Sequence, residues 1–324
     1  MTTLSDPRWV GIDIAKATLD VCLLPEETMF QVANDAAGWA ALLARLPADD
    51  PVTIVLEATG SYHRGVTLAL TGAGHPPAVI NPQRTHAFMV SEGVRSKTDR
   101  SDARLLARFG QQKGPAPSPV LSENARILTD LVGCRDDLTK SLVMEKNRLG
   151  VASAAVRDVH ETTIAFLTGQ IARVDARIAD LIAADADLTA RGAVLRSAPG
   201  IGPVLSAVLL ARLPELGTTA PKALAALAGV APYARDSGTK RGARTIGGGR
   251  PAVCKALFQM ARTAVRCDPT MGAHYRQLRG RMPDKAALIA CARRMVGILN
   301  AMLREGLTWQ DTDVGRGHFL PDPA

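Results

Sequence analysis

Apolar and polar positions along the first ~115 residues alternate between the spacing of strands and the spacing of helices. Four short apolar runs are typical of strands: residues 8–14, 18–24, 51–57 and 78–80. Two stretches among them carry apolar side chains at helical spacing: residues 36–46 and 62–71. Strands interleaved with helices in this order predict an α/β layer built on a mixed sheet.

A proline-rich break at 114–120 separates this region from two long helical stretches. In the second stretch eight positions follow a strict three-four spacing, and seven of them are apolar: Ile164, Leu167, Ile171, Val174, Ile178, Leu181, Asp185 and Leu188. The first stretch has a similar repeat of leucines, which Arg135 and Glu145 interrupt. Such a seam is typical of a coiled coil or a helical hairpin. Its partner is either a helix of the same chain or, in a dimerisation arm, a second copy.

The chain from residue 191 onward has a helical pattern interrupted by glycines. These changes along the chain predict three parts: an α/β domain at 1–115, a helical coiled-coil segment at 116–190 and a mainly α-helical domain at 191–324. A length of 324 residues and a hydrophobic content of 47% suit about two globular domains with full cores.

Charge is divided unequally along the chain. The net charge is +8, but residues 1–190 carry 19 Lys and Arg against 23 Asp and Glu, whereas 191–324 carry 20 against 8. Most of the excess lies in 235–294, with 14 basic and 3 acidic residues. A basic segment of this size predicts a nucleic-acid partner. The alternative is a solvated helix face rich in arginine.

The cysteines and the apolar segments bear on the location of the protein. Five cysteines, none of them in a C-x-x-C pair, favour a reducing compartment over a disulfide framework or a structural zinc site. The N-terminus has no basic region followed by a long apolar region, so no signal peptide is expected. The longest mainly apolar stretches, such as 204–211, are shorter than the ~20 residues that span a bilayer. The sequence therefore predicts a cytoplasmic protein without a membrane partner.

Four carboxylates stand at positions that favour a metal site. Asp13 lies inside an apolar run, where a charge is costly unless it is paired or binds a metal. Glu57 closes the third predicted strand, and strand ends present functional side chains in α/β sheets. Asp99 and Asp102 share one helix face, although a favourable charge at a helix N-terminus explains them equally well. Together the four would favour Mg²⁺ and phosphoryl-transfer chemistry.

The segment 198–203 (APGIGP) resembles a helix–hairpin–helix element between two apolar helices. Gly200 and Gly202 would let the backbone approach a phosphate, and the N–H groups that begin the next helix would donate to it. Such hairpins contact the sugar–phosphate backbone rather than the bases. The alternative is an ordinary packing corner between two helices.

A serine lies in a basic, glycine-rich loop. Ser237 is followed by Lys240, Arg241 and Arg244, and Arg250 ends the loop. Cations in this arrangement would stabilise the charge that develops on a phosphate under attack by a serine hydroxyl. No base stands beside the serine in the sequence, so a phosphate-binding loop without a nucleophile is the alternative.

Together these motifs resemble the DEDD transposases of the one-ten family of bacterial insertion sequences, which also includes Piv-type DNA invertases. The similar strings include GIDIAK around Asp13, LEATGSY around Glu57, INPQRTHAF, SEGVRSKTDRSDARLLA around Asp99 and Asp102, the PGIG hairpin, and LAGVAPYARDSGTKRGAR around Ser237. They follow the family's order over nearly the whole chain.

The resemblance implies a RuvC-like, RNase H-type N-terminal domain in which Asp13, Glu57, Asp99 and Asp102 bind Mg²⁺. It implies a C-terminal transposase domain with Ser237 as the nucleophile. The implied partners are double-stranded donor and target DNA, a non-coding guide RNA encoded by the element, and further copies of the chain in a dimer or a tetramer on DNA. One subunit's serine would complete another subunit's carboxylate site.

The predicted function is that of an RNA-guided transposase that cleaves and exchanges DNA strands through a phosphoserine intermediate. The alternative is a RuvC-like metal-dependent nuclease or junction resolvase, in which water attacks and Ser237 only binds phosphate. A non-enzymatic scaffold that binds RNA and DNA is the third hypothesis. The transposase hypothesis predicts a DNA adduct that survives denaturant. The nuclease hypothesis predicts free DNA ends without an adduct, and the scaffold hypothesis predicts binding without cleavage.

Overall fold

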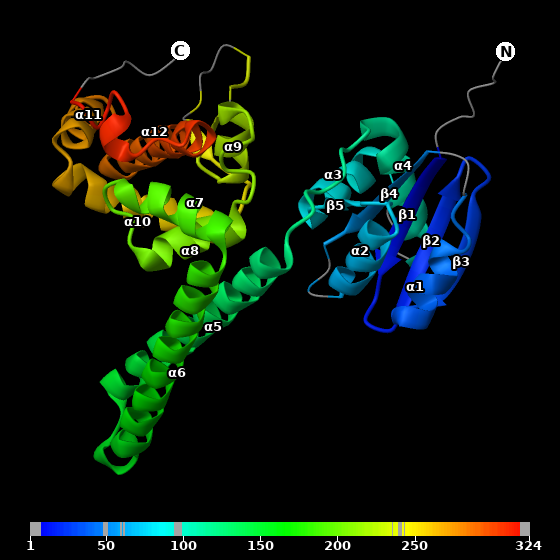
Figure 1. Ribbon diagram of the computed structural model, residues 1–324, viewed down its shortest axis with the longest axis horizontal. Coiled ribbons are helices and arrows are strands. Elements are labelled where there is room, and N and C mark those ends of the chain that lie inside the picture. The colour runs from blue at the N-terminus through cyan, green and yellow to red at the C-terminus, as the bar shows by residue number, and fades with distance from the viewer. Residues whose placement is uncertain are drawn as a thin grey trace. The chain divides into compact units, whose positions relative to one another are not determined.

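The chain divides into two compact units, residues 1–120 and 121–324 (Figure 1). The computed structural model describes the following residues, with only the backbone of 99–101: 8–47, 51–58, 60, 62–93, 99–234, 236–238, 242 and 244–317. The helices of the predicted middle segment pack within the second unit. The three-part division stays a prediction.

The N-terminal unit is built on a mixed five-stranded sheet in the order β3-β2-β1-β4-β5. Its strands are β1 (Arg8–Ile14), β2 (Thr18–Leu24), β3 (Thr28–Ala33), β4 (Val52–Glu57) and β5 (Ala78–Ile80). The first three strands are antiparallel neighbours, whereas β4 lies parallel to both β1 and β5. The predicted α/β layer with a mixed sheet is thereby confirmed. The sequence pattern missed β3 because this edge strand has no buried residue and lacks an apolar run.

Four helices cover the sheet: α1 (Ala36–Leu43), α2 (His63–Gly72), α3 (Pro82–Ser91) and α4 (Asp99–Lys113). Side chains of α1 and α2, such as Leu42 and Val66, bury one face of β1, β2 and β4. Phe88 of α3 and Phe109 of α4 pack on the other face with Val55 of β4. The sheet is therefore buried on both sides, and polar side chains within its strands are unusual enough to need an explanation.

The C-terminal unit is mainly helical, as predicted. Its helices are α5 (Glu123–Val151), α6 (Arg157–Ala184), α7 (Ala186–Ser197), α8 (Pro203–Arg212), α9 (Pro221–Leu227), α10 (Pro251–Cys267), α11 (Pro269–Arg279) and α12 (Asp284–Glu305). A two-stranded hairpin of β6 (Pro232–Tyr233) and β7 (Thr245–Ile246) interrupts them. Short 3-10 turns lie at Ala154–Val156 and Trp309–Asp311. Within this unit, Figure 1 shows α5 and α6 as a paired arm that projects from the other helices.

The predicted seam of α6 packs against α5 of the same chain. Val174, Ile178 and Ile182 are buried in the same cluster as Leu128 and Val132 of α5. This packing favours the helical hairpin over a seam shared with a second copy.

Both charged residues that interrupt the leucine repeat of α5 pair across the arm. Arg135 Nε donates to Asp175 at 2.5 Å, and Glu145 lies 2.5 Å from His160 Nδ1. These two pairs fix the register of α5 against α6. The one polar member of the α6 seam, Asp185, ends the helix and caps α7 by accepting from the Leu188 N–H at 3.0 Å.

The last long helix bears on the membrane prediction. α12 is long and apolar enough to cross a membrane by length and composition alone, although no stretch of that length was expected from the sequence. Its residues Cys291, Met295 and Leu299 are fully buried among other helices of the C-terminal unit. α12 is therefore the core helix of this unit.

Candidate functional site

A cavity of about 200 Å³ in the N-terminal unit brings three predicted carboxylates together. Asp13, Glu57 and Asp102 all line it, although they come from β1, the end of β4 and the first turn of α4. Asp99 begins α4, but its side chain is outside the described residues. Three elements far apart in sequence thus direct acidic groups to one place.

Gly11 explains how α4 reaches this cavity. A Cβ at Gly11 would stand 2.1 Å from the Ala103 carbonyl oxygen and 2.3 Å from the Ala107 nitrogen, so the backbone of α4 lies directly on β1. Side chains two apart in a strand share a face, which puts Asp13 on the same side of the sheet as Gly11. The close contact therefore seats the start of α4, with Asp102, beside Asp13.

The register of the parallel strands places Glu57. Leu56 lies beside Ile12, so Glu57 reaches the level of Asp13 at the carboxyl end of the sheet. The Thr85 hydroxyl of α3 donates a short hydrogen bond to Glu57, and its oxygen also lies 2.9 Å from the Pro82 carbonyl oxygen. Glu57 is therefore held in one orientation by the helix that follows β5.

Two residues near this site were not singled out from the sequence. Asp20 of β2 is directly opposite Asp13, is buried, and accepts from Gln31 Nε2 at 3.1 Å. Like charges opposite each other destabilise a sheet, so this pair adds to the site's attraction for a cation. His86 of α3 lines the cavity. The sequence could have identified Asp20 in the same way as Asp13, because both are carboxylates inside an apolar run.

The donors around the cavity suit Mg²⁺ in kind, because they are carboxylate oxygens. No three acidic, histidine or cysteine side chains within the described ranges are grouped closely enough to enclose a metal ion. Asp13, Glu57 and Asp102 are the residues that would hold the ion. Their metal-binding role stays a prediction.

Ser237 is exposed in the loop of the β6–β7 hairpin. The neighbouring Asp236 accepts from the Gly242 N–H at 3.0 Å and forms an ion pair with Arg244 at 3.6 Å. These contacts close the loop and hold one guanidinium near the serine. Lys240 and Arg241, the other predicted cations, lie outside the described residues.

Arg250 is engaged within the chain. Its two terminal nitrogens each lie 2.6 Å from a carboxylate oxygen of Glu215, and Nη1 also donates to the Arg212 carbonyl at 2.9 Å. Burial raises the pKa of Glu215, but the Arg250 guanidinium outweighs burial and leaves that pKa below its usual value. Arg250 therefore anchors the end of the glycine-rich loop, and its predicted contact with nucleic acid stays a prediction.

The two glycines of the predicted helix–hairpin–helix differ in environment. Gly200 has φ +83°, and a Cβ there would stand 2.7 Å from the Met260 carbonyl oxygen of α10. Gly202 is exposed at the start of α8, and a Cβ there would meet nothing within 4 Å. Packing explains Gly200, whereas Gly202 is open to an external partner. Nucleic-acid binding by either glycine stays a prediction.

We expect Gly200→Ala to destabilise the protein and Gly202→Ala to leave its stability nearly unchanged. At Gly200 the positive φ costs an alanine about 1–2 kcal/mol, and overpacking against α10 adds roughly 1–3 kcal/mol. Urea unfolding of both variants measures the difference. Equal stability of the two would contradict this account of the hairpin. A loss of DNA affinity in the stable Gly202→Ala protein would indicate that the hairpin contacts DNA.

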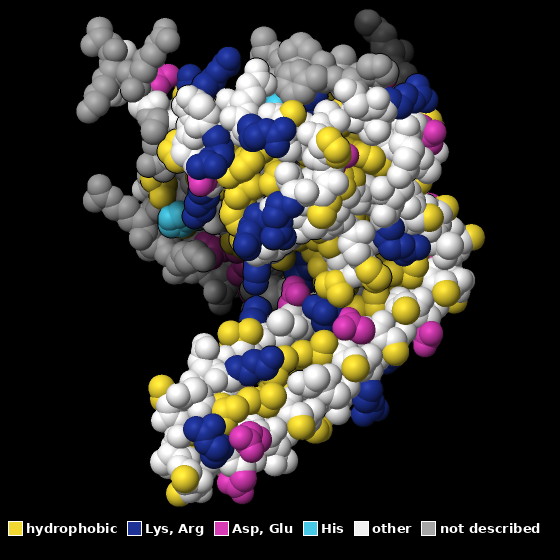
Figure 2. Space-filling view, turned by 90° about the vertical axis from the view of Figure 1, so that its left-hand side faces the viewer, with side chains coloured by type: hydrophobic (Ala, Val, Ile, Leu, Met, Phe, Trp, Pro, Cys, Tyr) yellow, Lys and Arg dark blue, Asp and Glu magenta, His cyan; other side chains and the backbone are white. Residues whose placement is uncertain are grey.

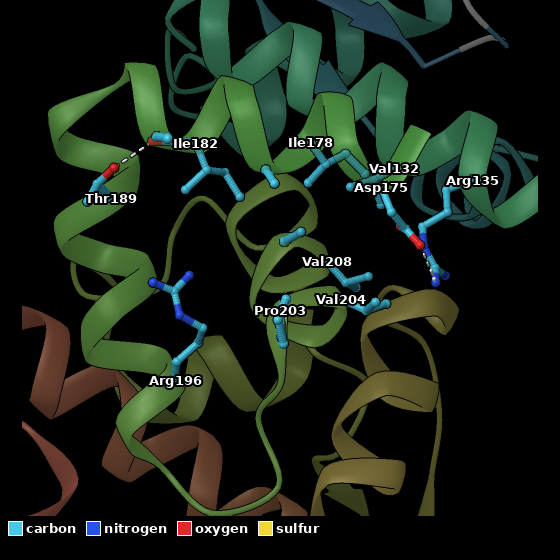
Figure 3. A pocket seen from close by; sticks show the side chains of 13 residues that line it. Val132, Arg135, Asp175, Ile178, Ile182, Thr189, Arg196, Pro203, Val204 and Val208 are labelled. Atoms are coloured by element: carbon cyan, nitrogen blue, oxygen red, sulfur yellow. Dashed lines mark hydrogen bonds and ion pairs between the residues drawn. The ribbon is translucent and has the colours of Figure 1, made fainter. Parts of the chain in front are cut away.

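The C-terminal unit also contains a groove of about 470 Å³ where α5, α6, α7 and α8 meet. Figure 3 shows Ile178, Ile182 and Val208 along it, with Arg196 on α7 and the Arg135–Asp175 pair at one end. The lining is mostly apolar. Such a lining suits contacts with apolar side chains, whereas the carboxylates that line the cavity of the N-terminal unit suit a cation.

Cations are frequent on the surface of the C-terminal unit. On the side of this unit turned toward the viewer in Figure 2, Lys and Arg side chains outnumber those of Asp and Glu. The exposed Lys and Arg side chains on α10 and α11 are Lys255, Arg262, Arg266, Arg276 and Arg279. This distribution suits a polyanionic partner.

Comparison with known proteins adds an independent observation. Residues 10–152 match the DEDD transposase model of IS110 elements, described as "Transposase", and residues 192–276 match "Transposase IS116/IS110/IS902 family". The chain is similar to the pilin gene-inverting protein of Moraxella bovis, with 31% identity over 237 residues that cover 71% of this chain and 74% of the relative. It is also similar to the insertion element IS116 uncharacterized 44.8 kDa protein of Streptomyces clavuligerus, with 27% identity across 94% of this chain and 96% of the relative.

Proposed function

Because the chain belongs to the IS110 family of transposases, we propose that it moves an insertion sequence by cleaving and exchanging DNA strands, with Ser237 as the nucleophile. The observation that supports this chemistry most is the cavity lined by Asp13, Glu57 and Asp102. A relative named for gene inversion supports recombination rather than simple cleavage. The N-terminal unit would be the RuvC-like, RNase H-type domain, and the protein would act on cytoplasmic DNA.

Strand cleavage would form a bond between Ser237 Oγ and the phosphorus of a backbone phosphodiester. One phosphorus–oxygen bond to deoxyribose breaks, the serine proton passes to a base, and the departing oxygen takes up a proton. The phosphoserine ester keeps the energy of the broken bond, so a second DNA hydroxyl can attack it and restore Ser237. Arg244, held beside the loop by Asp236, stabilises negative charge on the phosphate oxygens.

Asp13, Glu57 and Asp102, joined by Asp99, would hold Mg²⁺ in this proposal. The ion would polarise the scissile phosphate and neutralise part of its charge. Thr85 contributes by fixing the orientation of Glu57, and Gly11 by allowing α4 to bring Asp102 to β1. Their roles are those of positioning residues.

The partners in this proposal are double-stranded donor and target DNA and a structured guide RNA encoded by the element. The basic surface of the C-terminal unit supports a polyanionic partner but does not distinguish RNA from DNA. We also propose a dimer, or a tetramer on DNA, in which one subunit's Ser237 serves another subunit's carboxylate cavity.

We expect the arm to mediate self-association through its exposed apolar side chains rather than through its buried seam. These side chains are Val143, Met144, Val151, Val156, Val159 and Phe166, and apolar side chains follow the arm in Figure 2. Phe166→Asp should lower the mass measured by light scattering at micromolar concentration, because it places a charge in this surface. Ala172→Asp introduces the same charge at another exposed position of α6 and serves as the control. A monomeric wild type, with and without nucleic acid, would contradict the proposal.

The proposed function is tested with a labelled DNA substrate carrying the element's ends, the wild-type chain, its RNA and Mg²⁺. We expect a protein–DNA adduct that survives denaturing electrophoresis and maps by mass spectrometry to the peptide containing Ser237. Free DNA ends without an adduct would support the metal-dependent nuclease or junction resolvase. Binding without cleavage would support the non-enzymatic scaffold.

A further inference from the structure

A second hollow, of about 480 Å³, lies in the C-terminal unit at the base of the hairpin that carries Ser237. Ile246, the last residue of β7, and the following Gly247 and Gly248 form one side of it. Lys255 and Phe258 reach it from α10, and Lys285 from the start of α12. Its volume is within the range of sites that hold small ligands.

The hollow is electropositive. Lys255 and Lys285 are both exposed, and neither forms an ion pair with any described residue. The carboxylate nearest in sequence, Asp284, is bound by Arg279 Nε at 2.5 Å. Two ammonium groups therefore line one concave surface, and no carboxylate of the described residues lines it with them, so the surface suits a phosphate.

The glycines of the hollow leave its surface open. The adjacent Gly249, which is not part of the lining, lies tightly against the turn at Gly229, because a Cβ at Gly249 would stand 2.4 Å from the Gly229 nitrogen. At Gly247 and Gly248, in contrast, a Cβ would meet nothing within 4 Å. The chain's own packing does not fill this side of the hollow, so the backbone of a ligand can approach it closely.

The remaining lining is apolar. Phe258 is half-buried and faces the hollow together with Ile246 and Ile289. An aromatic ring beside cations is the combination that binds single-stranded nucleic acid, because bases stack on the ring while phosphates meet the cations. A duplex keeps its bases paired and stacked, so only an unpaired nucleotide can use both features.

We infer that this hollow binds one unpaired nucleotide of the DNA strand that Ser237 attacks, with its phosphate at Lys255 and Lys285 and its base on Phe258. The inference rests on the proposed function, in which the exchanged strand must separate from its complement. Tyr233 of β6 pairs with Thr245 beside the hollow. Ser237 follows Tyr233 by four residues, which span at most ~13 Å. The hollow is thus within a few nucleotides of the scissile phosphate.

The test measures binding of a fluorescent single-stranded DNA oligonucleotide to the full-length protein by anisotropy. We expect the double variant Lys255→Gln/Lys285→Gln to bind about tenfold more weakly. The slope of log affinity against log salt should fall by about 0.7, because one phosphate contact is lost. Lys146→Gln/Arg177→Gln removes two exposed charges from the arm and serves as the matched control. Phe258→Leu should weaken single-strand binding several-fold and leave duplex binding unchanged.

Protection of the Cys254 thiol from alkylation measures occupancy of the same hollow in the wild-type protein. This thiol lines the hollow, and burial raises its pKa, so alkylation is followed at mildly alkaline pH. The oligonucleotide should protect Cys254, whereas the exposed Cys267 at the end of α10 should react as before.

The outcomes separate this inference from the function on which it rests. Equal weakening by the lysine and arm variants, or an unprotected Cys254, would overturn the inference and leave the transposase proposal intact. Tighter binding and protection with single-stranded RNA than with DNA would also overturn it, because the occupant would then be the guide. If the wild type binds no DNA in any form, the proposed function itself fails.

Discussion

Replacing Ser237 with alanine is expected to reduce strand cleavage to background, a loss of about 10³-fold or more, and to abolish the protein–DNA adduct. The substitution removes one exposed oxygen from a hairpin loop, so the fold and the affinity for DNA and RNA should hardly change. A serine hydroxyl is a weak nucleophile at neutral pH, and in the proposed mechanism Arg244, paired with Asp236, would supply part of the positive charge that assists it. The measurement is a denaturing gel with labelled DNA, followed by mass spectrometry of the peptide that contains residue 237.

The control for this experiment lies in the same hairpin. Thr245→Val removes an exposed hydroxyl from β7 at nearly constant volume and should cleave like the wild type. Ser237→Cys should keep at most a trace of activity, because a thiolate is nucleophilic but reacts poorly at phosphorus. Cleavage by Ser237→Ala at the normal rate would show that water is the nucleophile, and the nuclease hypothesis would replace the transposase mechanism.

Substitution of Asp13 or Asp102 by alanine is expected to abolish recombination while nucleic-acid binding persists. The two carboxylates line the cavity of the N-terminal unit, whereas the cationic surface belongs to the C-terminal unit. Metal assistance to phosphoryl transfer contributes several kcal/mol, so its loss should slow cleavage by at least ~10²-fold. Cleavage and anisotropy assays on the same preparations separate the two effects. Full recombination by Asp13→Ala in Mg²⁺ would remove the metal-site assignment.

Metal binding can be measured without activity. A ligand at a hundred times its Kd stabilises the folded state by about 2.7 kcal/mol, so saturating Mg²⁺ should raise the Tm of the wild type. Asp13→Ala should lose this response, and Asp158→Asn, which changes an exposed arm carboxylate, should keep it. Identical shifts in all three proteins would mean that Mg²⁺ binds elsewhere.

The sequence was informative where a residue conflicted with its surroundings. Asp13 is a charge within an apolar strand, and Glu57 ends a buried one, which made both stand out before any geometry was known. The mixed sheet and the helical C-terminal unit followed from periodicity alone. The convergence of Asp102 with these residues depends on the contact of α4 with Gly11, and no local pattern encodes that contact.

Contacts between residues that are far apart in the sequence could not be predicted from local patterns. Asp20 becomes a neighbour of Asp13 only through the antiparallel register of β1 and β2. Arg250 looked like a free cation of a basic loop because its partner, Glu215, lies 35 residues away. The seam of α6 has the same pattern whether it faces α5 or a second chain. The sequence therefore identifies charged side chains and apolar seams, but only the folded structure shows which residues they contact.

The order of residues along the chain sets the order in which the parts of the proposed site are synthesised, with Asp102 of α4 made after β1 and β4 and before Ser237. Ribosomes add about 5–20 residues per second, and domains generally fold from the N-terminus. β1 and β4 therefore leave the ribosome roughly 2–9 s before Asp102, and Ser237 follows after roughly 7–27 s more. Because domains fold as units, the N-terminal unit with Asp13, Glu57 and Asp102 is complete while the C-terminal unit with Ser237 is still being made. In the proposed mechanism, a chain that still lacks residue 237 has no nucleophile and cannot join itself to DNA.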